Sequence, residues 1–134
     1  MNQLGDEETT AGDDGSVMIV VATDAPLSSR NLERLARRAV LGLARTGSFM
    51  SNGSGDFVIA FSTRNRIPYR QPDATLAKQE LSNDRMSPLF LAVVESVEES
   101  VYNSLTKATT VRGIEGHTSS AIPLDRLRAI LADD

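Results

Sequence analysis

The stretch that decides the fold is Ser16-Val-Met-Ile-Val-Val-Ala-Thr23. It is short, almost entirely apolar and rich in β-branched residues, which is typical of a strand that is covered on both faces. We therefore predict a central strand over residues 16–23, and we interpret Asp24 as a residue that closes the following turn.

Helix and strand signals alternate after this strand. Ser29 is a suitable N-cap for a helix whose apolar residues recur at helical spacing as far as Leu43, and Gly47 marks its end. A second apolar run predicts another buried strand over residues 56–63. Residues 64–85 contain two prolines and show weak periodicity, so they are expected to form a long loop.

A second long helix is predicted from Ser87 as N-cap, with Pro88 in the first helical position. A glycine-rich stretch over residues 112–118 and a short amphipathic helix from Pro123 complete the chain, so the fold class is α/β. Two strands are too few for a stable sheet, and we expect a partner segment from outside these residues to complete it. The buried stripe of the second long helix is predicted to contain Phe90, Val93, Val94, Val97, Val101, Leu105 and Ala108.

The composition suits one ordinary domain, because the 134 residues are 40% apolar and 24% charged. The chain has no cysteine and a single histidine, His117, so thiolate metal sites are excluded and we expect no metal and no cofactor. The longest apolar run near the start, residues 17–22, is far shorter than the roughly 20 residues that span a bilayer. We expect no contact with a membrane and a cytoplasmic location.

Charge is concentrated at the start of the chain. Residues 1–15 contain five acidic residues and no basic one, and they have few apolar groups, so we interpret them as a flexible acidic leader ahead of a folded portion over residues 16–134. Without the leader the charge is near zero, and six aromatic residues give no pattern for nucleic-acid binding. The arginines at positions 30, 34, 37, 38 and 45 are interpreted as a solvated helix face with local acidic partners, in preference to a phosphate-binding stripe.

The junction between Gly15 and Ser16 places a hydroxyl at the start of a buried strand. Such a hydroxyl can attack the preceding carbonyl in an N-to-O acyl shift, and hydrolysis of the ester leaves serine as a new N-terminus, whose α-amino group can act as a base. Glycine allows the carbonyl to be approached. On the pattern alone, a glycine and a serine before a strand are more often part of an ordinary loop.

Ser54 and Asp56 lie two residues apart at the start of the second strand. If the two strands pair, the hydroxyls of Ser16 and Ser54 can meet, a carboxylate can position a hydroxyl, and nearby glycine N–H groups can bind an oxyanion. On spacing alone, a tight turn into a strand is the commoner explanation. His117 is interpreted as a surface or capping residue in preference to a base.

Several stretches together resemble the C-terminal part of the DmpA-type self-processing L-aminopeptidase/D-esterase (β-aminopeptidyl) family. The resemblance covers nearly all of residues 12–134 in the same order. It is carried by Gly15-Ser-Val-Met-Ile-Val-Val-Ala-Thr-Asp-Ala-Pro-Leu27, by residues 35–47, by Ser51-Asn-Gly-Ser-Gly-Asp56 with Ala-Phe-Ser-Thr63, by Glu98-Glu-Ser-Val-Tyr-Asn-Ser-Leu105 and by Gly116-His-Thr118.

This resemblance implies the C-terminal portion of an αββα sandwich similar to N-terminal-nucleophile hydrolases. It implies cleavage between Gly15 and Ser16 into an α chain and a β chain, with Ser16 as the nucleophile, Ser54 as its activating hydrogen-bond partner and Asp56 as the carboxylate that orients Ser54. Some members have Glu at this last position, and Asp is one methylene shorter. The asparagine for the oxyanion and the tyrosine near the nucleophile belong to the α chain.

The expected function is that of an N-terminal-serine aminopeptidase that releases N-terminal residues from small peptides, amides or esters through an acyl-enzyme, without metal. The expected partners are the α chain of the same precursor and further αβ units in an oligomer. Hydrolysis of a β-alanyl amide is a related alternative. The non-enzymatic alternative is a catalytically incomplete fragment or interaction subunit of the same fold.

Overall fold

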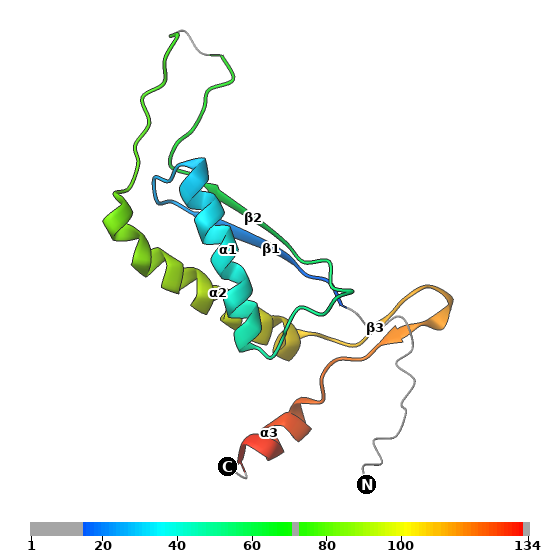
Figure 1. The fold of residues 1–134 in the computed structure, drawn as a ribbon. Helices are drawn as coiled ribbons and strands as arrows, with labels where there is room; N and C mark the ends of the chain where they lie inside the picture. The colour runs from blue at the N-terminus through cyan, green and yellow to red at the C-terminus, as the bar shows by residue number, and fades with distance from the viewer. Residues whose placement is uncertain (1–14, 71–72, 133–134) are drawn as a thin grey trace.

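The computed structural model describes residues 15–70 and 73–132, so the predicted leader lies outside the described residues except for Gly15. Helices and strands alternate at first, as the sequence predicts, and short elements follow (Figure 1). The elements are β1 (Met18–Thr23), α1 (Ser29–Arg45), β2 (Phe57–Ser62), a 3-10 turn (Asn83–Arg85), α2 (Met86–Lys107), β3 (Val111–Arg112), a 3-10 turn (Ile114–Gly116), β4 (Thr118–Ser119) and α3 (Leu124–Ala132).

Strands β1 and β2 form a two-stranded parallel sheet. Met18 lies opposite Phe57 and Thr23 lies opposite Ser62, so the N-terminal ends of the two strands meet at one end of the sheet. A parallel pair needs a crossover connection, and α1 provides it. This register brings the residues before β1 next to the residues before β2.

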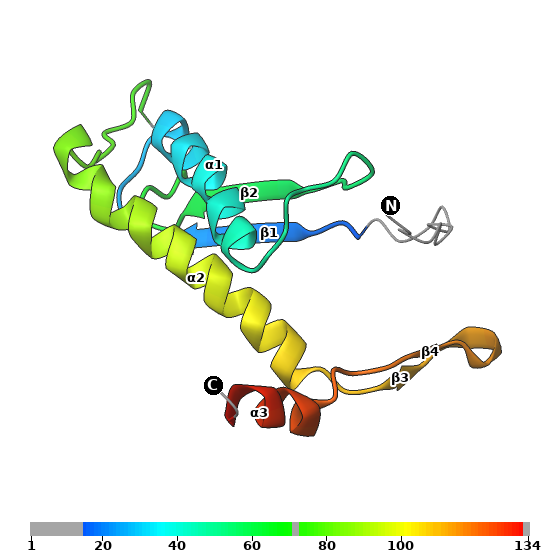
Figure 2. The ribbon, with the colours of Figure 1, turned by 60° about the horizontal axis from the view of Figure 1, so that its bottom comes forward.

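Helices α1 and α2 pack against one face of this sheet (Figures 1 and 2). Leu35 and Ala39 of α1 and Val93 and Val97 of α2 are buried, and Ile19 of β1 packs against them. Apolar burial of this kind is the main favourable contribution to folding.

The opposite face of the sheet is open. The prediction that β1 is covered on both faces is therefore wrong for this chain, because both helices lie on the same side and every second residue of β1 and β2 is exposed. The exposed apolar residues on this face are Met18, Val20, Phe57, Ile59 and Phe61. The expectation that two strands require completion from elsewhere agrees with this open face.

The α1 helix begins one residue away from the expected cap. Ser28, not Ser29, is the N-cap, and it makes no capping bond because its hydroxyl donates to Glu80. Asn31, buried in the first turn, donates its side-chain amide to the same carboxylate at 3.0 Å. These contacts fix the end of the loop that joins β2 to α2.

The α2 helix differs from the prediction at both ends. It starts at Met86, directly after the 3-10 turn, so Ser87 is inside the helix and Pro88 stands in the first turn, where backbone N–H groups have no helical partner. The buried stripe ends at Val101, since Leu105 is 49% exposed and Ala108 lies beyond the helix end. The helix extends past the sheet at this end (Figure 2), and residues 104–107 of its last turn are exposed.

Two arginines of α1, Arg37 and Arg45, have acidic partners, but only that of Arg37 is local as predicted. Arg45 pairs with Glu98 of α2 at 3.1 Å, and Arg34 and Arg38 lie over the ring of Phe90. Arg37 pairs with Glu33 one turn earlier on α1. The contacts of Arg34, Arg38 and Arg45 hold α1 against α2.

Two further segments extend away from the sheet and its helices. The described parts of residues 64–82 form the expected long loop, and the small antiparallel β3–β4 hairpin, which was not predicted, projects beyond the C-terminal end of α2 (Figures 1 and 2). α3 confirms the predicted C-terminal helix. Across the described residues, none of the helices has the length and hydropathy that crossing a membrane requires.

Candidate functional site

The candidate site lies where the N-terminal ends of β1 and β2 meet. The N–H of Phe57 donates to the carbonyl of Val17 at 3.0 Å, which extends the strand pairing to the last residue before β1. Ser16 and the turn over residues 54–56 therefore become neighbours, although they are almost forty positions apart in the sequence. The fold thus brings Ser16, Ser54 and Asp56 to the same end of the strand pair.

Asp56 holds both sides of this junction. Its Oδ1 atom accepts the N–H of Val17 at 3.0 Å, and its Oδ2 atom accepts the hydroxyl of Ser54 at 2.8 Å. The shorter carboxylate of Asp, compared with Glu, therefore reaches Ser54 without difficulty. Bonds to an ionised acceptor are among the stronger hydrogen bonds, so Asp56 fixes both the start of β1 and the position of Ser54.

The two hydroxyls contact different partners. Ser54 Oγ lies 3.0 Å from the carbonyl oxygen of Gly15, and the N–H of Gly55 donates to Ser16 Oγ at 3.0 Å. No hydrogen bond joins the hydroxyls of Ser16 and Ser54 in the described part of the chain. The expected glycine N–H is thus present, but it contacts the hydroxyl of Ser16.

The two glycines of the site, Gly15 and Gly55, differ in how much space a side chain would have there. A Cβ atom on Gly55 would lie 3.2 Å from Ser16 Oγ, so a side chain there would displace the hydroxyl. A Cβ atom on Gly15 would meet nothing within 4 Å. Position 55 is therefore tight for a side chain in this structure, whereas position 15 has open space around it.

Other candidate groups lie outside this junction. His117 is exposed in the β3–β4 hairpin, where its carbonyl accepts the N–H of Gly113, and Asp24 is exposed in the bend after β1. Residues 15–70 and 73–132 contain no cluster of three or more histidine and carboxylate side chains that could hold a metal ion. The sequence does not identify Val17 as a site residue. Its backbone N–H donates to Asp56, and this contact can be recognised only when the register of β1 and β2 is known.

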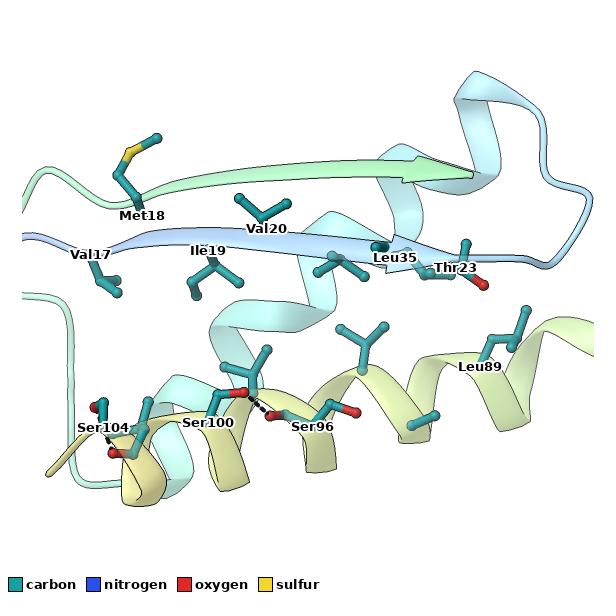
Figure 3. A pocket seen from close by; sticks show the side chains of 16 residues that line it. Val17, Met18, Ile19, Val20, Thr23, Leu35, Leu89, Ser96, Ser100 and Ser104 are labelled. Carbon is teal, nitrogen blue, oxygen red and sulfur yellow. Dashed lines mark hydrogen bonds between the residues drawn. The ribbon is translucent and has the colours of Figure 1, made fainter. Parts of the chain in front are cut away.

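A groove of about 460 Å³ lies between β1 and α2 (Figure 3). Its strand side is apolar, with Val17 at the end nearest the site, and its helix side carries serines of successive turns. Ser100 donates its hydroxyl to the carbonyl of Ser96 at 2.6 Å, and Ser104 donates to that of Val101 at 2.8 Å. These two hydroxyls are bonded within their own helix, so the groove offers a mainly apolar surface and not a second reactive site.

Comparison with known proteins gives consistent matches. The model of the family described as Peptidase family S58 matches residues 1–119. The β-peptidyl aminopeptidase BapA of Sphingosinicella microcystinivorans is 41% identical over 118 residues, which are 88% of this chain and 30% of that protein.

Two solved structures contain a similarly folded part. The L-aminopeptidase D-Ala-esterase/amidase of Ochrobactrum anthropi, described as a variant of the Ntn hydrolase fold, aligns with a TM-score of 0.80 and 39% identity, over 88% of this chain and 33% of that one. A β-aminopeptidase of a Burkholderia species aligns with a TM-score of 0.73 and 35% identity, over 85% and 34%. The α/β fold described above therefore corresponds to a portion of an Ntn-hydrolase-like fold, and the chain spans about a third of the length of these relatives.

Proposed function

Because the chain belongs to peptidase family S58, we propose that it is the C-terminal part of a self-processing serine aminopeptidase that is cut between Gly15 and Ser16. Residues 1–15 are then the end of the α chain, and residues 16–134 are the β chain. The observation that carries the proposal is the junction itself, where Ser16, Ser54 and Asp56 meet at the ends of two parallel strands.

In the processed enzyme Ser16 supplies the nucleophile. Its hydroxyl attacks the carbonyl of the substrate, its own α-amino group, with an ordinary pKa of about 7.7–8.0, accepts the proton, and an acyl-enzyme forms that water hydrolyses. Ser54 acts as a hydrogen-bond partner for the nucleophile, and Asp56, bonded to Ser54 at 2.8 Å, fixes its orientation. The N–H of Gly55 positions Ser16 Oγ from the other side.

The partner of this chain is the preceding part of the same precursor. Support comes from the open apolar face of the β1–β2 sheet, from the absence of a third strand beside β1 among the described residues, and from the coverage of only about a third of the relatives. Burying such a face is worth roughly 25 cal/mol per Å². We propose a cytoplasmic αβ unit that assembles further into an oligomer.

The substrates are proposed to be small peptides, amides or esters from which the N-terminal residue is released. The support is that the relatives are described as a β-peptidyl aminopeptidase and as an L-aminopeptidase and D-Ala-esterase/amidase. A β-alanyl amide is the second substrate class, because one of these relatives acts on β-peptidyl bonds.

Activity of the full-length protein tests this proposal. The release of p-nitroaniline from the p-nitroanilides of L-alanine and β-alanine is measured for the wild type, for Ser16→Ala and for Ser62→Ala. Ser62 is a matched control, because its hydroxyl donates to the carbonyl of Ala25 at the opposite end of the same strand pair. We expect activity in the wild type and in Ser62→Ala and none in Ser16→Ala. Equal turnover in Ser16→Ala would exclude the serine mechanism, and no turnover of any substrate would favour a non-enzymatic subunit.

A further inference from the structure

We propose that Phe57 determines substrate specificity: its ring forms an apolar wall beside the hydroxyl of Ser16, and the side chain of the released residue packs against this wall. The inference rests on the proposed function, in which Ser16 Oγ becomes bonded to the carbonyl carbon of that residue. It narrows the substrate class to peptides, amides and esters whose N-terminal residue has an apolar side chain.

The side chain of Ser16 lies on the open face of the β1–β2 sheet. Side chains along a strand point alternately to the two faces, and the exposure of these residues alternates in the same way. Ser16, Met18 and Val20 are exposed, and the residues between them, Val17 and Ile19, are half-buried. Figure 3 shows Met18 and Val20 pointing away from α2 and Val17 and Ile19 pointing toward it. A substrate therefore reaches the hydroxyl of Ser16 from the open face.

Phe57 is the aromatic residue of β2 nearest to Ser16 on this face. It lies opposite Met18 in the parallel register, and both side chains are 63% exposed. Gly55 stands between the ring and the hydroxyl: a Cβ atom on Gly55 would lie 3.2 Å from Ser16 Oγ and 4.0 Å from Cε2 of Phe57. Because glycine has no side chain, a notch that is bordered by the hydroxyl on one side and by the ring on the other stays open.

The acyl group of the substrate is the occupant that this notch fits. In the acyl-enzyme the carbonyl carbon is bonded directly to Ser16 Oγ, so the side chain of the released residue lies close to the same oxygen. The ring of Phe57 offers it an apolar surface. Burial of an apolar side chain against the ring is favourable, whereas a charged side chain would lose hydration there without gaining a partner.

The more distant part of the open face serves as a comparison. Ile59 and Phe61 lie farther along β2, opposite Val20 and Ala22 of β1, and are also exposed. In the proposed αβ unit the preceding part of the precursor covers them. That cover has to leave the Ser16 end accessible, because the substrate must reach the hydroxyl. Phe57 thus stands at the border between the covered face and the substrate.

Substrate preference of the full-length protein tests this role. We measure kcat/KM with the p-nitroanilides of L-leucine and glycine for the wild type, for Phe57→Ala and for Phe61→Ala, which makes the same change on the same strand and face. Glycine has no side chain to contact the ring, so the ratio of the two values isolates this contact from any general loss of activity. One methylene in an apolar pocket is worth about 10- to 200-fold, so we expect the leucine-to-glycine ratio to fall at least about tenfold in Phe57→Ala and to stay near the wild-type value in Phe61→Ala.

The possible results separate this inference from the proposed function. An unchanged ratio in Phe57→Ala, or an equal fall in Phe61→Ala, would overturn the inference and leave the serine aminopeptidase standing. A wild type that is active but does not prefer the leucine substrate to the glycine substrate would overturn it as well. If the wild type turned over neither of these substrates nor the p-nitroanilides of L-alanine and β-alanine, the proposed function would fail, and this inference with it.

Two milder substitutions keep the test decisive if Phe57→Ala does not fold. Phe57→Val places a shorter side chain of high strand propensity at this position, and Phe57→Tyr retains the ring. Intact mass first shows that each variant is cut as the wild type is. We expect a lower leucine-to-glycine ratio in Phe57→Val and an unchanged ratio in Phe57→Tyr. A wild-type ratio in Phe57→Val would contradict the assignment.

Discussion

Asp56 links the start of β1 to the turn before β2 through both of its carboxylate oxygens. Asp56→Ala leaves the N–H of Val17 and the hydroxyl of Ser54 without this acceptor. We expect a loss of about 1–3 kcal/mol in the free energy of unfolding together with slower self-cleavage. Urea denaturation and intact mass of the full-length protein measure the two effects. Asp125→Ala is the control, since Asp125 is fully exposed in a surface pair with Arg128, and an equal loss in both variants would contradict the bridging role.

Gly55 is the residue at which a single methyl group disturbs the nucleophile. In Gly55→Ala the new Cβ would lie 3.2 Å from Ser16 Oγ and would displace it. Because small misplacements of reacting groups cost up to about 100-fold in rate, we expect cleavage to slow by at least about tenfold. The control is Gly113→Ala, where the nearest atom is 3.6 Å away. Cleavage at the wild-type rate in Gly55→Ala would contradict this assignment.

The sequence predicts which residues come together at the junction better than it predicts their contacts. Ser16, Ser54 and Asp56 were identified from their positions at the starts of two apolar runs and from a family resemblance. The contact of Ser54 with Gly15 and that of Gly55 with Ser16 depend on the register of β1 and β2. These strands are joined through α1, so no tight turn fixes their register in the sequence.

At the scale of elements, the close crossing of α1 and α2 depends on Gly42. A Cβ atom at this position would lie 2.4 Å from the carbonyl oxygen of Val94 and 2.8 Å from Cβ of Val97. Gly42→Ala is therefore expected to destabilise the protein by about 1–3 kcal/mol, although alanine has the better helix propensity by about 1 kcal/mol. Thermal unfolding of the full-length protein measures the change, and an unchanged or higher Tm would contradict the packing described here.

The sequence predicts the long elements because their apolar residues are strongly periodic. It does not predict the residues at which these elements begin and end. Ser28 replaces Ser29 as the cap of α1, and α2 starts at Met86 because a 3-10 turn leads directly into it. The β3–β4 hairpin was missed because each strand has two exposed residues and no periodicity to recognise. Short pairings of this kind depend on tertiary context more than on local sequence.

At the scale of the whole molecule, the open face of the β1–β2 sheet predicts dependence on the rest of the precursor. Ile59 is 54% exposed at the centre of this face. We expect Ile59→Lys to improve the solubility of the 134-residue chain expressed alone, and to reduce folding of the full-length protein, where the charge would be buried without a partner. Tyr69→Lys, at a fully exposed loop position, is the control. Normal folding of full-length Ile59→Lys would show that this face stays in contact with water.

We propose that the bond between Gly15 and Ser16 is cut and that Ser16 becomes an N-terminal nucleophile. Intact mass combined with N-terminal sequencing of the full-length protein, for the wild type and for Ser16→Ala, tests it most directly. We expect two chains in the wild type, the smaller one starting at Ser16, and a single uncut chain in Ser16→Ala. A single uncut chain in both, or a cut at the same place in both, would contradict it.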